Sequence, residues 1–162
     1  MASRSGTQSA RRSARRSVAP EEEGTKFKYI ETSALLAALL EQDVAARSAL
    51  RGKRPRVTSA LTFTEAARAL VRARVAQRLT PAEERKGLRW LQEFRHRCDV
   101  VAVTDAVLAR AGRPFPVEPI RTLDALHLAT AELLGEPPQL VTIVTRDLRV
   151  IDNARAMGYM VE

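Results

Sequence analysis

The sequence predicts an α/β protein, a three-layer α/β/α sandwich with a mainly parallel central sheet. Three observations predict this class. Helical stretches alternate with short β-like runs, and alternating units of this length are typical of a parallel sheet covered by helices on both faces. The length of 162 residues fits one ordinary domain with a short appendage. The β-like runs are residues 26–31, 56–59, 99–103, 140–145 and 159–161.

The first strand and the helix after it are predicted from residues 26–40. Residues 26–31 (KFKYIE) alternate polar and apolar side chains, as a short strand does. Thr32 and Ser33 favour the start of a helix at Ala34, because Ser and Thr often cap helix N-termini. Residues 56–59 (RVTS) form the second strand candidate.

The middle of the chain predicts two long helices, a strand and a short helix. Residues 62–77 form an arginine-rich amphipathic pattern. Residues 80–83 (TPAE) open the next helix, with a capping box and a proline at its first position. Residues 99–103 (DVVAV) predict a buried strand, and residues 104–111 a short helix that Gly112 closes.

The last part of the chain completes the alternation. Residues 113–119 hold three prolines and predict a loop, and residues 121–134 predict a strongly apolar helix. Residues 140–145 (LVTIVT) are rich in β-branched side chains and give the clearest strand pattern in the chain. Residues 147–157 predict a helix, and residues 159–161 a last short strand.

The chain is basic, with 27 Lys and Arg against 19 Asp and Glu and a net charge of +8, which suits a polyanionic partner. Residues 1–25 contain five arginines, three glutamates and few large apolar side chains, so a disordered tail is predicted there. Residues 26–162 keep a net charge of +6. The basic character therefore belongs mainly to the predicted folded domain.

Several classes of protein are excluded by composition. The single cysteine, Cys98, excludes an internal disulfide framework and a multi-cysteine zinc site. The longest purely apolar run, residues 34–40, is seven residues long, far short of the roughly 20 that span a bilayer. No apolar segment follows the arginine pairs of the tail, so no export signal is predicted. We expect a soluble cytoplasmic protein.

Four acidic residues stand out by their position. Glu31 closes the first strand and Asp147 follows the 140–145 strand, and ligands of open parallel sheets bind at such strand ends. Asp124 lies in an apolar helix, where a carboxylate needs a cation or hydrogen-bond donors. Glu65 follows the second strand. Carboxylates without histidine or thiolate partners suit Mg²⁺ or Mn²⁺, and these ions promote phosphodiester hydrolysis.

Each of these acids also has a purely structural interpretation, because acids cap helices and pair with arginines. The alternatives are a capping box of Glu65 with Thr62, a helix cap at Asp147, an exposed strand end at Glu31 and neutralisation of Asp124 by Arg121.

Arginines of the 62–77 helix are candidates for contact with nucleic acid. Arg68 and Arg72 are four residues apart and therefore neighbours on one helix face. Such residues hold phosphates or simply form a solvated surface. The chain has only seven aromatic residues, so we expect recognition of a nucleic-acid backbone and its shape rather than a base-stacking platform.

The acidic residues and their flanks resemble the motifs of the PIN-domain family. Residues 29–35 (YIETSAL) resemble the family's opening motif, which has Asp where Glu31 stands. Glu65 with Ala66 matches its second motif. Residues 121–131 (RTLDALHLATA) closely resemble the third and most specific motif, and residues 145–147 (TRD) the fourth. The resemblance covers essentially residues 26–162, in the family's order.

This resemblance implies a PIN-like fold and a ribonuclease that depends on Mg²⁺ or Mn²⁺. Small members are mostly VapC-type toxins, which dimerise and are inhibited by an antitoxin that blocks the acidic site. His127 is a candidate proton donor, but in the resembled motif this position is more often a packing residue. By the same analogy the catalytic, metal-holding residues are Glu31, Glu65, Asp124 and Asp147, and the side chains that hydrogen-bond to them are Thr145, Thr32 and Ser33.

Glu31 departs from the family pattern by one methylene group, so its carboxylate must fold back to reach the same position. Misplacement by about 1 Å costs a catalytic site on the order of 10²-fold in rate. The alternative function is a weakened PIN domain that serves as an RNA-binding or protein-interaction module. A DNA-structure nuclease on the related fold usually needs extra helical elements, which the 137 residues 26–162 barely accommodate. A DNA-binding regulator explains the charge but not Asp124.

Overall fold

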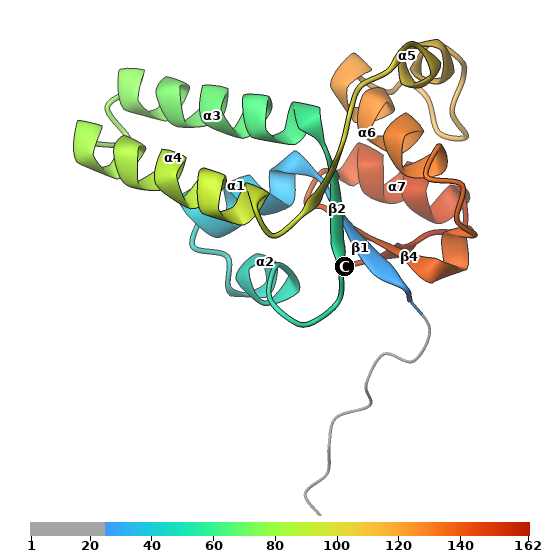
Figure 1. Ribbon diagram of the computed structural model, residues 1–162. Helices are drawn as coiled ribbons and strands as arrows, with labels where there is room; N and C mark the ends of the chain where they lie inside the picture. Colours follow the sequence, from blue (N-terminus) through green and yellow to red (C-terminus); the bar gives the residue numbers. More distant parts are fainter. Residues whose placement is uncertain (1–24) are drawn as a thin grey trace, which may run out of the picture.

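The computed structural model describes residues 25–162, so the predicted tail lies outside the described residues except for Thr25 (Figure 1). All the strand pairs are parallel, and the strands follow the order β3-β2-β1-β4-β5. This confirms the predicted parallel sheet. The strands are β1 (Phe27–Ile30), β2 (Arg56–Ser59), β3 (Asp99–Val101), β4 (Val141–Val144) and β5 (Met160–Val161).

Helices cover both faces of the sheet, which confirms the three-layer sandwich. Figure 1 shows α1 to α4 on one side of the sheet and α5 to α7 on the other. The helices are α1 (Thr32–Leu40), α2 (Val44–Ala49), α3 (Ala60–Val75), α4 (Pro81–Arg95), α5 (Asp105–Ala111), α6 (Thr122–Glu132) and α7 (Leu148–Ala156), with a 3₁₀ turn, η1 (Pro138–Leu140), before β4.

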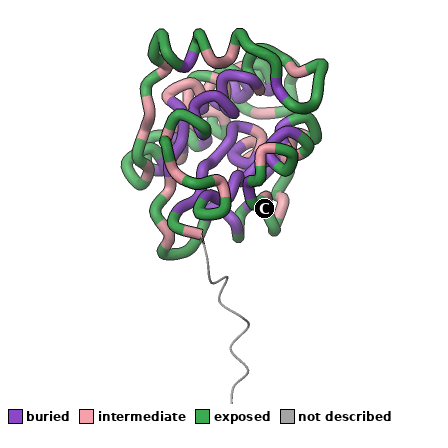
Figure 2. The backbone as a smooth tube through the Cα atoms, turned by 90° about the vertical axis from the view of Figure 1, so that its right-hand side faces the viewer, coloured by how far each residue is buried: buried purple, intermediate pink, exposed green. Residues whose placement is uncertain are grey.

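Two apolar cores separate these layers, because successive side chains of a strand point to opposite faces. Ile30 and Val144 face α1 to α4 and pack with side chains such as Leu35 and Leu70. Tyr29 and Ile143 face α5 to α7, where they pack with side chains that include Leu128. Figure 2 shows the buried backbone running through the middle of the molecule, beneath an exposed shell.

Helix α1 starts differently from the sequence prediction. Its cap is Glu31, whose side chain accepts a hydrogen bond from the backbone N–H of Ser33, and the helix begins at Thr32. The prediction of Thr32 and Ser33 as caps was therefore wrong. The reason is that the long Glu31 side chain folds back over the first turn and takes the capping role, which frees both hydroxyl groups for other partners.

Three smaller features also differ from the sequence prediction. Helix α2 was not predicted, and Asp43 caps it by accepting from the N–H of Ala46 at 2.9 Å. Helix α3 begins at Ala60, two residues earlier than its apolar periodicity indicates, because Ser59 caps it. Gly112 keeps a right-handed conformation at the end of α5, so it is not the left-handed residue that commonly ends a helix.

Strand register brings the predicted acidic residues to one edge of the sheet. Strand β1 lies between β2 and β4, and Ile30 pairs with Val144. The N–H of Glu31 donates to the carbonyl of Val144 at 3.0 Å, so Glu31 and Thr145 leave the sheet side by side. The strand ends at Glu31 and near Asp147 are therefore neighbours.

The α-helices of residues 25–162 include none that is both long enough and apolar enough to cross a lipid bilayer.

Candidate acidic active site

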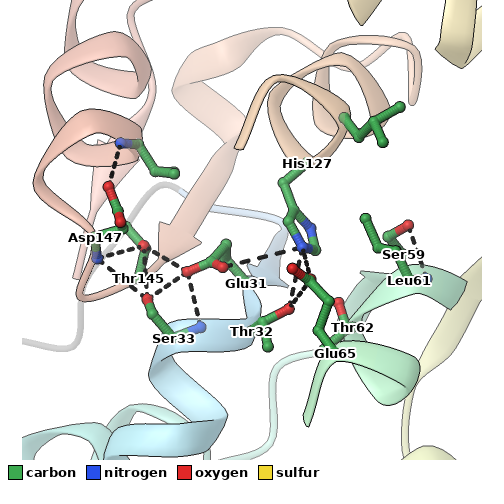
Figure 3. A network of polar contacts seen from close by, with 12 residues as sticks. Glu31, Thr32, Ser33, Ser59, Leu61, Thr62, Glu65, His127, Thr145 and Asp147 are labelled. Atoms are coloured by element: carbon green, nitrogen blue, oxygen red, sulfur yellow. Dashed lines mark hydrogen bonds and ion pairs between the residues drawn. The ribbon is translucent and has the colours of Figure 1, made fainter. Parts of the chain in front are cut away.

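Glu31 is the best-anchored carboxylate of the candidate site. Its side chain is only 5% exposed. One oxygen, Oε2, accepts from the Ser33 N–H at 3.0 Å, from the Thr145 hydroxyl at 2.8 Å and from the Ser33 hydroxyl. The other oxygen, Oε1, lies 4.0 Å from Nε2 of His127. Glu31 therefore has one oxygen fixed by donors and a second that faces the site (Figure 3).

Ser33 joins the two chain segments that leave β1 and β4. Its hydroxyl donates to Glu31, and its oxygen accepts from the backbone N–H groups of Arg146 at 2.7 Å and Asp147 at 3.1 Å. The Thr145 oxygen also accepts from the N–H of Asp147 at 3.1 Å. These bonds fix the 145–147 segment against the start of α1.

Asp147 caps the N-terminus of α7. Its Oδ1 accepts from the N–H groups of Arg149 at 2.8 Å and Val150 at 3.4 Å. The capping interpretation is thus confirmed, but it occupies one oxygen only. Within residues 25–162, no donor bonds to Oδ2. Capping and a role in the site are therefore compatible for Asp147.

Glu65 belongs to a second network, on the other side of Glu31 (Figure 3). Its Oε2 lies 2.5 Å from the Thr32 hydroxyl, which donates to it, and 2.8 Å from Nε2 of His127. Burial raises the pKa of Glu65, but the hydrogen bonds from His127 and Thr32 and the nearby Arg72 charge outweigh burial, so this pKa lies below its ordinary value. Glu65 is consequently ionised at neutral pH.

His127 connects Glu65 to Tyr29 through its two ring nitrogens. An ionised carboxylate can only accept, so Nε2 carries the hydrogen and donates to Glu65. Its other nitrogen, Nδ1, lies 3.1 Å from the Tyr29 hydroxyl, which donates to it wherever the ring carries a single hydrogen. Burial, reinforced by the charges of Glu31 and Glu65, raises the pKa of Tyr29, so the phenol keeps its proton. The chain Tyr29–His127–Glu65 is therefore directional.

Tyr29→Phe is expected to lower the free energy of unfolding by about 1–2 kcal/mol, because Nδ1 of buried His127 loses its donor. Urea denaturation measures this change. The matched control is Tyr159→Phe, since Tyr159 is also buried but its hydroxyl bonds to none of the described side chains. Equal losses in the two variants would show that the Tyr29 hydroxyl contributes nothing specific.

Asp124 lies in the first turn of α6 with a buried oxygen, Oδ2, that has no hydrogen-bond partner among the described residues. Burial raises the pKa of Asp124, and the charges of Asp147 and Glu31 raise it further. Arg121 and Arg149 oppose this rise, but neither forms an ion pair with Asp124. Neutralisation by Arg121 therefore does not satisfy this carboxylate.

The four acids lie in adjoining networks on either side of Glu31 and do not form a preassembled metal site. Across residues 25–162, no three His, Cys, Asp or Glu side chains are already close enough together to hold a metal ion. The all-oxygen donor set nevertheless suits Mg²⁺ or Mn²⁺, and the unpartnered oxygen of Asp124 is what a cation would satisfy. The residues fit such an ion.

The two candidate RNA-binding arginines occupy different surroundings. Both are exposed on α3. The charge of Arg72 reaches Glu65, whereas no interaction joins Arg68 to an acid of the site among the described residues. Arg68 nevertheless follows Glu65 by one turn of α3, so both arginines lie on the part of the helix next to this acid.

Sequence reasoning favoured packing over a proton-donor role for His127 and missed its bond to Glu65. The histidine is buried, as a packing residue is, but it also bonds to Glu65. A usable signal existed, because a buried imidazole in an apolar helix needs polar partners. Tyr29 was also missed, although it stands two residues before Glu31 and so on the same side of β1.

The fold and site together define a parallel α/β protein with acidic side chains gathered at the carboxyl ends of its central strands. The PIN-domain family model matches residues 28–156. The chain belongs to the PIN-domain family. Two relatives from Mycobacterium tuberculosis are Ribonuclease VapC46, 38% identical over 82% of this chain and 94% of the relative, and Ribonuclease VapC35, 33% identical over 82% and 93%.

Solved structures show the same fold at low sequence identity. VapBC2 from Rickettsia felis, bound to a DNA fragment from their promoter, contains a chain that matches with a TM-score of 0.58 and 12% identity, over 84% of this chain and 97% of that one. A toxin–antitoxin complex from Klebsiella pneumoniae matches with a TM-score of 0.52 and 19% identity, over 76% and 89%.

Proposed function

We propose that this protein is a metal-dependent endoribonuclease, the toxin of a toxin–antitoxin pair, acting in the cytoplasm as a homodimer. The observation that carries the proposal is the buried, unpartnered Asp124 oxygen, which shares its surroundings with Glu31 and Asp147. Such a carboxylate destabilises the protein unless a ligand compensates for it. The ribonuclease names of the relatives support the same chemistry.

Each acid has a defined part in this proposal. Asp124, Asp147 and the free oxygen of Glu31 would hold Mg²⁺ or Mn²⁺, and a bound ion supplies an activated water and neutralises phosphate oxygens. Thr145 and Ser33 orient Glu31 by bonding to its other oxygen. Thr32 and His127 fix Glu65 in its ionised form, ready to accept a proton from water.

The test is cleavage of total bacterial RNA by antitoxin-free protein, with Mn²⁺, with Mg²⁺ and with a chelator. We expect discrete fragments that require the metal. Glu31→Asp, run beside the wild type, separates the two functions. An inert wild type beside an active Glu31→Asp variant would show that Glu31 marks a lost activity and that the binding-module function is correct. Inert protein in every lane contradicts the nuclease proposal.

The antitoxin would bind a groove between α1, α2, α3 and α4. This groove has a volume of about 740 Å³. Its apolar lining includes Leu70, Trp90 and Phe94, and Glu83 is the one acidic residue among the described residues that line it. An amphipathic helix with acidic edges complements such a surface. The basic lining residues are Arg47, Arg51, Arg78, Lys86 and Arg97.

Charge reversal tests this groove. Arg78→Glu combined with Lys86→Glu is expected to weaken binding of the cognate antitoxin by about 10-fold or more, because like charges then face each other. Titration calorimetry measures the affinity. The matched control reverses Arg85 and Arg89, which lie exposed on the same helix α4 but do not line the groove. Equal weakening by both pairs would place the antitoxin elsewhere.

A further inference from the structure

The acidic residues alone would repel the RNA backbone, so cations must stand near them for RNA to bind. Among the described residues, three arginines flank Asp124 and Asp147 along the chain: Arg121, Arg146 and Arg149. One of them, Arg146, is already committed, since its Nε donates to Asp43 at 2.9 Å. Arg121 and Arg149 are the other two, and they come from different helices.

Both arginines sit where a helix begins beside an acid of the site. Arg121 immediately precedes α6, one turn before Asp124. Arg149 is in the first turn of α7, and its backbone N–H donates to Asp147 at 2.8 Å. Both side chains are exposed, and neither makes a hydrogen bond or an ion pair with another residue of the described chain. They are thus free to bind a ligand.

The two side chains act on the same carboxylate. Burial, Asp147 and Glu31 raise the pKa of Asp124, and the charges of Arg121 and Arg149 both oppose the rise. The geometry also places the two arginines near each other. Helix α6 packs against α7. Glu31 contacts both segments, since its Oε1 lies 4.0 Å from Nε2 of His127 on α6 and its Oε2 accepts from Thr145 just before α7. The N-terminal ends of α6 and α7 add partial positive charge at that side of the site.

We propose that Arg121 and Arg149 together bind the RNA backbone on the Asp124 side of the site. A guanidinium group can donate to two phosphate oxygens at once. It therefore fixes the position of the RNA strand in addition to neutralising part of its charge. On the opposite side Arg72 lies near Glu65, so the strand passes over the acids with arginine on both sides. This inference rests on the proposed function, because it concerns RNA at the same site.

A purely structural role for these arginines predicts something different. If they only offset the repulsion among the carboxylates, their removal would lower the stability of the protein and leave its affinity for RNA unchanged. Affinity and its salt dependence therefore separate the two roles. Each phosphate contact in single-stranded nucleic acid contributes about 0.7 to the slope of log affinity against log salt.

The experiment measures binding of a fluorescently labelled, mixed-sequence single-stranded RNA to the full chain, in chelator, over a range of salt concentrations. The variants are Arg121→Ala, Arg149→Ala and the double variant. Arg155→Ala is the matched control, because Arg155 is exposed at the far end of the same helix as Arg149. We expect each single variant to weaken binding about fivefold, the range of an exposed ion pair, and to reduce the salt slope, while Arg155→Ala changes little.

Two results would overturn the inference: no RNA binding by the wild type, or equal affinities and slopes in the wild type, the arginine variants and the control. RNA cleavage with metal is scored separately. An inert wild type that binds RNA through both arginines removes the proposed function and keeps this inference. If the wild type cleaves RNA but both arginine variants bind RNA as tightly as the wild type, the proposed function stands and this inference is wrong.

Discussion

Asp124→Asn is expected to abolish RNA cleavage and, at the same time, to stabilise the metal-free protein. Activity should fall by about 10²–10³-fold, as it does when a charged group is removed from a preorganised site. Stability should rise, because Asn carries no charge and removes the repulsion that Asp147 and Glu31 exert on a buried carboxylate. Cleavage of bacterial RNA and thermal unfolding in chelator measure the two effects.

The pH dependence of that stabilisation has a definite sign. Burial, Asp147 and Glu31 raise the pKa of Asp124 in the folded state above its ordinary value of 3.8, so between these two pKa values the folded state binds more protons than the unfolded state. The stability that Asp124 contributes therefore falls as the pH rises through this window. The difference in unfolding free energy between variant and wild type should be largest above the raised pKa. It should shrink toward zero as the pH falls to 3.8.

Asp105→Asn is the matched control, because Asp105 is likewise an acid in the first turn of a helix but is exposed. It should leave cleavage unchanged and should not stabilise the protein. A loss of stability in Asp124→Asn would contradict our account of Asp124 as an unsatisfied charge.

Glu31→Gln should also abolish cleavage, but with the opposite effect on stability. The variant has nearly the same shape and lacks the charge that three donors from Ser33 and Thr145 now share. Exchanging charge-assisted hydrogen bonds for neutral ones should lower the unfolding free energy by about 1–2 kcal/mol. Activity should fall about 10²-fold, since the variant removes the negative charge of one of the carboxylates proposed to hold the metal. Urea denaturation and the RNA assay measure both.

Glu41→Gln supplies the control for this substitution at the other end of α1, where Glu41 is exposed. Neither stability nor cleavage should change in that variant. If Glu31→Gln proved as stable as the wild type, the hydrogen bonds to Oε2 would not be the reason that Glu31 tolerates burial.

The fold could be predicted from the sequence because its signals are local. The β-branched run at 140–145 and the capping box at Thr80 each specify an element without help from distant residues. Helix α2 could not be predicted in this way. It is only six residues long, and its N-terminus depends on Asp43, which Arg146 holds from a distant part of the chain.

The positions of the four acids along the chain could be predicted, but their individual surroundings could not. Glu31 and Thr145 meet because β1 and β4 are neighbours, and strand order is not a local property. The bond between His127 and Glu65 joins α6 to α3, 62 residues apart. Periodicity shows that His127 is buried, but only the assembled layers show which polar group it meets.

The single hydroxyl of Ser33 also limits how this protein can diverge. It serves Glu31 as a donor and the backbone of Arg146 and Asp147 as an acceptor. A small apolar replacement would lose both functions, and a larger side chain would push apart two junctions that lie 113 residues apart in the sequence. The chain segments after β1 and β4 therefore depend on each other structurally. A substitution that moves one of them also disturbs the hydrogen bonds of the other.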